Sequence, residues 1–99
     1  MSVLITMKVP GDTKKFRAAL SERAEEMAGI GERAKQQGAL HHRFGVGADF
    51  VVVVDEWETA EQFESFFGTP ELQAFVAEIG GSGEPEIWVS EAVSSADRY

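Results

Sequence analysis

The chain has 99 residues, enough for one domain with a single core, and its 43% hydrophobic and 26% charged residues are typical of a folded protein. Its formal net charge of -8 disfavours nucleic acid and anionic membranes as partners. Because cysteine is absent, disulfides, thiolate metal sites and cysteine nucleophiles are excluded, which is compatible with a cytoplasmic protein. Residues 1–10 do not form a signal-peptide pattern, and no apolar run approaches the roughly 18 residues of a membrane helix, so we expect neither export nor membrane insertion.

The first two predicted elements are a strand and a helix. Apolar and polar residues alternate over residues 3–9, which is the period of a strand, and Pro10 and Gly11 end it. Asp12 or Thr13 is expected to cap the helix that follows. Its apolar residues recur at spacings of three and four: Phe16, Leu20, Ala24, Met27 and Ala34.

Two glycines interrupt this helical pattern. Gly29 and Gly31 each cost about 1 kcal/mol relative to alanine, so we expect the helix to bend or loosen there. Gly38 is the expected C-terminal stop.

A hairpin comes next. Residues 39–46 and 50–57 are predicted strands, joined by the tight connection 47–49. Residues 51–54 are all valine, so we expect the second of these strands to be covered on both faces.

The last part of the chain is predicted as a helix and a strand. Thr59 is expected to cap the helix, Gly68 to interrupt it, and Thr69 with Pro70 to restart it. A glycine-rich link, 80–83, leads to a fourth strand over 86–93, with Ile87, Val89 and Val93 on one face. Residues 94–99 are expected to be a flexible tail or to clasp a partner.

This βαββαβ order predicts an α+β, ferredoxin-like fold: one domain over residues 1–99, with a four-stranded antiparallel sheet and two helices on one face. The second face of the sheet is then uncovered. We expect it to carry Leu4, Val51, Val53 and Trp88, a set too apolar to face water. A homodimer that pairs two such faces would cover it.

The segment from Val51 to Phe67, followed by Gly68-Thr-Pro-Glu-Leu, resembles the third strand and second helix of antibiotic biosynthesis monooxygenase-like proteins, which belong to the dimeric α/β-barrel superfamily. The resemblance covers nearly the whole chain in element order, and His41-His-Arg-Phe leading to Asp55-Glu-Trp is similar to a group of small uncharacterised proteins of this kind. It implies a dimer with a cleft between helices and sheet. The superfamily includes cofactor-independent oxygenases, haem-degrading enzymes, isomerases and members without assigned chemistry.

The haem-degrading branch resembles this chain without gaps in the first strand and again from Trp57 onward. Its functional Asn falls on Met7, its cleft Trp on Phe66 and its haem-ligating His on Val76. Methionine cannot donate an amide hydrogen bond and valine cannot ligate iron, which disfavours haem degradation by that mechanism. Monooxygenases that act on polycyclic aromatic substrates use a similar Asn and Trp, so the same departures disfavour that activity too.

The two histidines are neighbours on a strand and point to opposite faces, so they cannot chelate one metal ion together. If Leu40, His42, Phe44 and Val46 face the helices, His42 enters the cleft and His41 does not. His42 is then the imidazole suited to acid-base chemistry near neutral pH, or else a hydrogen-bonded structural residue.

Asp55 and Glu56 also point to opposite faces. One of them could share a proton with His42 from the adjacent strand; alternatively, both lie at the surface or in the dimer contact. Trp57 and Trp88 are each either an aromatic wall for a flat ligand or core and interface residues.

These residues predict a small apolar cleft lined by Met7, His42, Phe66 and Trp57, with no metal and no cofactor. Three hypotheses follow. The chain is a cofactor-free enzyme acting on a small aromatic or polyketide-like molecule with His42 as the base, a non-catalytic module that binds such a molecule, or a structural dimer whose cleft is filled by its own side chains.

Overall fold

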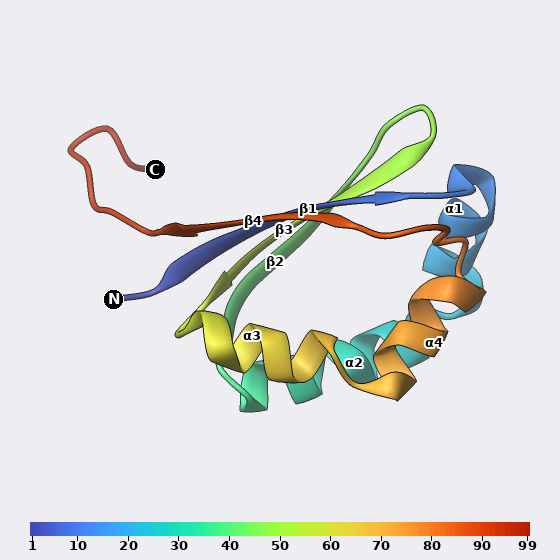
Figure 1. Ribbon diagram of the computed structural model, residues 1–99, viewed down its shortest axis with the longest axis horizontal. Coiled ribbons are helices and arrows are strands. Elements are labelled where there is room, and N and C mark those ends of the chain that lie inside the picture. The colour runs from blue at the N-terminus through green and yellow to red at the C-terminus, as the bar shows by residue number, and fades with distance from the viewer.

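The computed structural model describes residues 1–99 and confirms the α+β, ferredoxin-like fold (Figure 1). The elements in chain order are β1 (Val3–Pro10), α1 (Thr13–Glu22), α2 (Ala24–Gln36), β2 (Ala39–Val46), β3 (Phe50–Trp57), α3 (Ala60–Phe67), α4 (Pro70–Glu78) and β4 (Glu86–Glu91). The strands form one antiparallel sheet in the order β2-β3-β1-β4, and all the helices lie on one face of it. None of these helices has the length and apolar character needed to cross a membrane.

Each of the two predicted helices consists of two shorter ones. The expected interruption at Gly68 is confirmed, with Pro70 in the first turn of α4. The expected bend at Gly29 and Gly31 is wrong, because both glycines lie inside α2 and the chain breaks at Arg23 instead. The break reorients the chain so that α1 and α2 each direct apolar side chains onto the same part of the core.

Arg23 ties this break to the second pair of helices. Its guanidinium donates to Glu26 at 2.6 Å and to Glu78 of α4 at 2.9 Å, and it lies 4.7 Å from the centre of the Phe75 ring. These hydrogen bonds, to Glu26 first and then to Glu78, raise the pKa of Arg23. The contacts link the α1–α2 junction to α4 across the helix layer.

The core lies between the helices and one face of the sheet. Ile5, Met7 and Val9 of β1 face the helices, and β3 pairs with β1 so that Val51 lies opposite Val9 and Val53 opposite Met7. Strand side chains alternate between faces, so these two valines are buried under the helices as well.

The prediction that Val51 and Val53 lie on the uncovered face is therefore wrong, since only 9% and 7% of their surfaces are exposed. The register places Val52 and Val54 on that outer face instead. Leu4 and Trp88 do lie on it, with 38% and 52% of their surfaces exposed. A run of four valines has no alternation of its own, so only pairing with β1 decides which two point inward.

The fourth strand is shorter than expected. It ends at Glu91, so Val93 lies beyond the strand and does not share a face with Ile87 and Val89. Those two residues lie on the helix-facing side of an edge strand and remain largely exposed. After Ala92, whose N–H donates to the Ser2 carbonyl, the chain extends away from the sheet (Figure 1).

The start of α3 is stabilised by a capping box. The Thr59 hydroxyl accepts from the Gln62 N–H, and the Gln62 side chain accepts from the Thr59 N–H. We therefore expect Thr59→Ala to lower the free energy of unfolding by about 1 kcal/mol, measured by urea denaturation. Ser65→Ala in the same helix is the control. It should be neutral or slightly stabilising, because alanine has the higher helix propensity. Equal losses in both variants would contradict this role for the cap.

Candidate functional site

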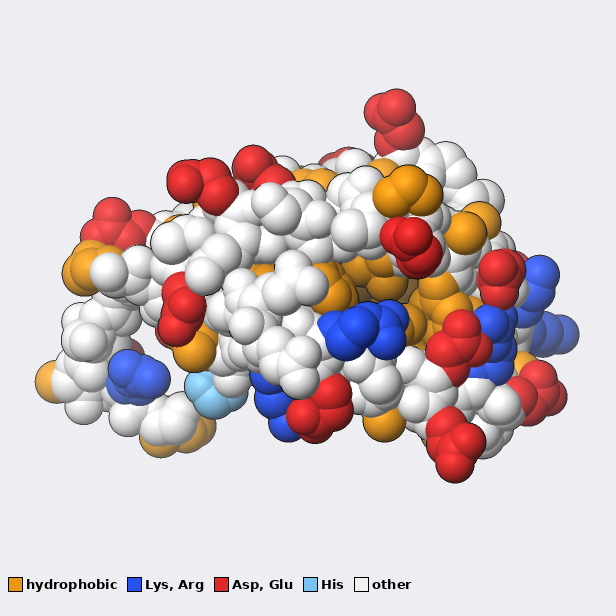
Figure 2. Space-filling view, turned by 90° about the horizontal axis from the view of Figure 1, so that it is seen from below, with side chains coloured by type: hydrophobic (Ala, Val, Ile, Leu, Met, Phe, Trp, Pro, Cys, Tyr) orange, Lys and Arg blue, Asp and Glu red, His pale blue; other side chains and the backbone are white.

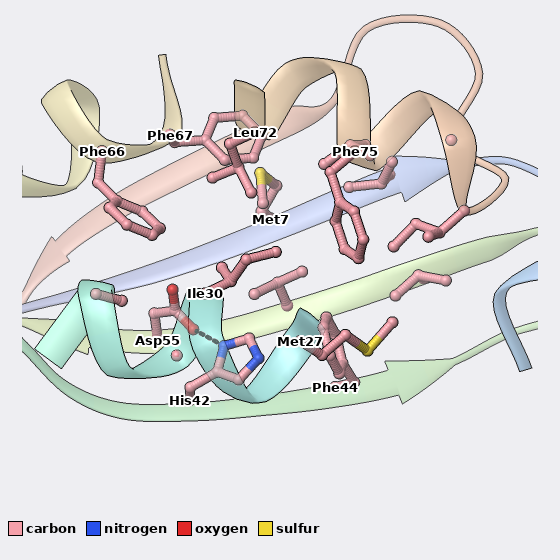
Figure 3. A pocket seen from close by; sticks show the side chains of 18 of the residues that line it. Met7, Met27, Ile30, His42, Phe44, Asp55, Phe66, Phe67, Leu72 and Phe75 are labelled. Atoms are coloured by element: carbon pink, nitrogen blue, oxygen red, sulfur yellow. Dashed lines mark hydrogen bonds and ion pairs between the residues drawn. The ribbon is translucent and has the colours of Figure 1, made fainter. Parts of the chain in front are cut away.

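A cavity of about 480 Å³ lies between the sheet and the helices. This volume is within the range of small-molecule sites. Met7 and Val53 are in its floor, Met27 and Ile30 are in the wall formed by α2, and the opposite wall comes from α3 and α4 with Phe66, Leu72 and Phe75 (Figure 3). Seen from the helix side, apolar side chains line a hollow between the helices, and charged side chains surround it (Figure 2).

One polar group stands out in this apolar wall. His42 Nδ1 lies 2.6 Å from Oδ1 of Asp55, and the indole N–H of Trp57 donates to Oδ2 of Asp55 at 3.1 Å. Because a carboxylate only accepts hydrogen bonds, the network assigns the hydrogen to Nδ1 of His42. Nε2 is then an acceptor, and Figure 3 shows it on the side of the ring away from Asp55, facing the cavity-lining side chains.

The hairpin register brings this pair together. β2 and β3 pair so that His42 lies opposite Asp55 and Phe44 opposite Val53, all on the helix-facing side. The Phe44 ring meets the His42 imidazole edge-on, with their centres 4.6 Å apart. This contact and the bond to Asp55 restrict the imidazole from two sides.

Asp55 is the least exposed charged residue of the site, with 9% of its surface accessible. Both of its oxygens have a donor, as a buried carboxylate requires. Its immediate neighbour Glu56 points to the other face, where it accepts from the Ser2 hydroxyl and lies 3.9 Å from Nε2 of His41. Of the two acidic residues, Asp55 is therefore the one that reaches His42.

The four residues predicted to line the cleft all contribute to the cavity wall. Met7 is in the floor and Phe66 is in the α3 wall. Trp57 packs against the rings of Phe63 and Phe66 with only 1% of its surface exposed, so its main contact in the site is the hydrogen bond to Asp55. Their functional roles, and that of His42, remain predictions.

The His41 side chain lies near Glu56 on the outer face, as expected for the neighbour of His42, although the residue also borders the cavity. No group of three or more His, Asp or Glu side chains comes together as a set of metal ligands in residues 1–99.

The residue pattern alone leaves the position of Asp55 open, although one signal in the sequence locates it. In a hairpin joined by residues 47–49, counting back from the turn pairs Val46 with Val51 and hence His42 with Asp55. The lining residues Met27, Ile30 and Leu72 offered no such signal, because helical spacing alone does not distinguish a cavity wall from packed core.

A double-mutant cycle tests the Asp55–Trp57 hydrogen bond. Asp55→Ala and Trp57→Phe should each destabilise the protein, and the double variant should be less destabilised than their sum by about 1.5–3 kcal/mol, because the bond has a charged acceptor. Urea denaturation measures all four proteins. The matched cycle of Asp55→Ala with Phe63→Leu, a ring that packs on Trp57 without a polar group, should be close to additive. Additive losses in the first cycle would contradict the bond.

The fold is similar to that of several solved structures. SnoaB, a cofactor-independent oxygenase from Streptomyces nogalater, matches with a TM-score of 0.66 and 11% identity over 98% of both chains. The ActVA-Orf6 monooxygenase of Streptomyces coelicolor, solved in complex with the ligand nanaomycin D, matches with a TM-score of 0.66 and 18% identity over 99% of this chain and 93% of that one. A dimeric ferredoxin-like protein from an uncultured marine organism matches with a TM-score of 0.65 and 13% identity over the same shares.

At these identities the structural matches establish the fold alone. A search of curated proteins finds no match. The sequence pattern of the antibiotic biosynthesis monooxygenase family, however, matches residues 1–78, which cover β1 to α4 and contain His42, Asp55 and Trp57. The chain belongs to the antibiotic biosynthesis monooxygenase family.

Proposed function

We propose that this protein binds a flat, multi-ring aromatic or polyketide-like molecule bearing a hydroxyl group, and that it catalyses a cofactor-independent oxygenation of that molecule. The observation that carries the proposal is the His42 imidazole, held through Nδ1 by Asp55 and presenting Nε2 to an apolar cavity of about 480 Å³. Two proteins of similar fold support it, since one is a cofactor-independent oxygenase and the other is a monooxygenase solved in complex with the ligand nanaomycin D.

In this mechanism His42 is the general base. The substrate hydroxyl donates to Nε2 and transfers its proton there, which leaves an electron-rich aryloxide in the cavity. Asp55 stabilises the imidazolium that forms, because its Oδ1 faces the proton on Nδ1. Trp57 is a positioning residue, since its indole N–H holds the second oxygen of Asp55.

Dioxygen is the co-reactant. The aryloxide gives up four electrons to dioxygen in total as one ring C–H becomes a carbonyl. One oxygen atom remains in the new C=O bond, and the other leaves as water together with the hydrogens lost from the hydroxyl and the ring carbon. Asp55 is largely buried while about half of the His42 side chain is exposed, so the pair joins a buried acceptor to an accessible imidazole.

This route depends on His42, because three other residues of the cavity offer no general base. Met7 and Val76 have no donor or ligand group, and Phe66 offers only an aromatic face. Of the two histidines, only His42 is held by Asp55 on the helix-facing side, whereas the His41 imidazole lies near Glu56 on the outer face. The same apolar walls favour a second candidate function, a module that binds such molecules without turning them over.

Substituting each of the two histidines in turn distinguishes an enzyme from a binding module. With wild-type protein, two- to four-ring hydroxyarenes should consume dioxygen, as an oxygen electrode would measure. His42→Gln should lower the rate by about 100-fold or more, since it removes the base, while binding measured by fluorescence changes little. His41→Gln is the matched control and should keep the wild-type rate. Undiminished turnover in His42→Gln would rule out the base, and binding without turnover in the wild type would identify a binding module.

We further propose that the protein is a homodimer paired through the outer face of the sheet. On this face Val54, Thr6 and Trp88 form one row across three strands, and Leu4 lies beside it on β1. Most of this row is apolar and partly exposed, which is unfavourable in water. A second copy of the chain covers it with an identical surface. The dimeric ferredoxin-like protein of similar fold supports this assembly.

Two separate lysine substitutions, one on each face of the sheet, test whether the outer face forms the dimer interface. Val54→Lys adds a charge to the outer face and should give a monomer, because two buried charges would meet across the interface. Val89→Lys is the matched control, since Val89 is similarly exposed, 49% against 44%, but lies on the helix-facing side. Analytical ultracentrifugation should find the mass of two 10.8 kDa chains for the wild type and for Val89→Lys. A wild-type monomer would refute the assembly.

A further inference from the structure

The α2 wall of the cavity contains a glycine at its centre. Met27, Ile30, Gly31 and Ala34 all line the cavity, at the spacings of three and four that mark one face of a helix. Between these side chains the wall at Gly31 is bare backbone. The cavity therefore extends closest to the axis of α2 at this residue.

The backbone does not require glycine there. Only Gly38, Gly80 and Gly83 have a positive φ, and Gly31 has not. Apart from its chain neighbours and the adjacent helix backbone, a Cβ added at Gly31 would meet nothing within 4 Å, whereas one at Gly38 would meet the Gln62 side chain. Neither a left-handed conformation nor a close approach accounts for Gly31, although glycine inside a helix costs about 1 kcal/mol relative to alanine.

Glycine at position 31 leaves room inside the cavity. Its neighbours on the same face point into the cavity, so a side chain at position 31 would project there too. The opposite wall is formed by Phe66 and Phe75, with Met7 in the floor between the two walls (Figure 3). Any side chain larger than hydrogen at position 31 would narrow the slot between α2 and the aromatic wall.

We propose that Gly31 is the size-determining residue of the cavity, and that it admits ligands of three or more fused aromatic rings which a larger residue would exclude. The inference rests on the proposed function of this cavity as the ligand site, and it specifies the substrate class. A broad, flat ring system fits a slot with bare helix backbone on one side and phenyl rings on the other. Its hydroxyl would meet Nε2 of His42 on the sheet side.

Gly29 provides a matched control within the same helix. It also has no positive φ, and a Cβ there would meet only the Arg33 guanidinium at 3.8 Å, the end of a flexible side chain. It does not line the cavity. Nothing in the structure explains the glycine at this position. The same substitution at 29 and at 31 therefore raises helix propensity equally and differs in whether it fills the cavity.

The test compares Gly31→Leu with Gly29→Leu using two fluorescent probes, 2-naphthol with two rings and 1-hydroxypyrene with four. The wild type and Gly29→Leu should bind both probes. Gly31→Leu should bind 1-hydroxypyrene about tenfold more weakly or worse, and 2-naphthol within about threefold of the wild type, because overpacking penalises only the ligand that needs the space. Gly31→Ala should lie between the wild type and Gly31→Leu.

Thermal unfolding separates a size effect from loss of structure. Both leucine variants should melt at or above the wild-type temperature, since leucine favours helix more than glycine. If Gly31→Leu melts lower, Gly31→Ala carries the comparison, because a Cβ fits there without a contact.

Three results would overturn the inference and leave the proposed function standing: unchanged 1-hydroxypyrene affinity in Gly31→Leu, equal losses for both probes, or an equal loss in Gly29→Leu. A wild-type protein that binds neither probe would instead refute the cavity as the ligand site, and the proposed role of Gly31 would fail with it.

Discussion

The antiparallel pairing of β3 with both of its neighbours is the constraint on which the rest of this structure depends. Pairing with β1 decides that Val51 and Val53 point toward the helices, and pairing with β2 places His42 opposite Asp55. A shift of one residue would turn every side chain of β3 to the other face and leave Asp55 on the outer surface. The core, the outer face and the polar pair in the cavity therefore all depend on the register of β3.

Asp55 is the most demanding group in that arrangement, because a carboxylate beneath a helix layer is unfavourable unless its oxygens are hydrogen-bonded. Trp57 and His42 supply one donor each, from the same strand and from its neighbour. The result is an imidazole of defined orientation in an otherwise apolar wall. Local order of this kind is what a general base needs, since its geometry is set before the ligand arrives.

Membership of the antibiotic biosynthesis monooxygenase family establishes the fold and the general kind of protein, while the chemistry depends on the residues that this chain places in the cavity. Met7 and Val76 offer neither an amide donor nor an iron ligand, and the His42–Asp55 pair offers a proton acceptor. Gly31 adds space on the α2 side. Together these positions are the basis on which we propose a large apolar ligand with one ionisable hydroxyl.

The sequence by itself determined the element order, both hairpin strands to the residue, the cap at Thr59 and the restart at Pro70, because period, glycine, proline and capping side chains act over a few residues. It also predicted that His42 enters the cleft. Only the tertiary structure decided which valines of residues 51–54 are buried and that the first helix breaks at Arg23, and it showed that Asp55, whose position the residue pattern leaves open, reaches His42. The valines depend on pairing with β1, the break accompanies the packing of α1 and α2 onto one part of the core, and the Asp55 contact depends on pairing with the opposite hairpin strand. Strand register and packing across layers select among local alternatives that the chain leaves open.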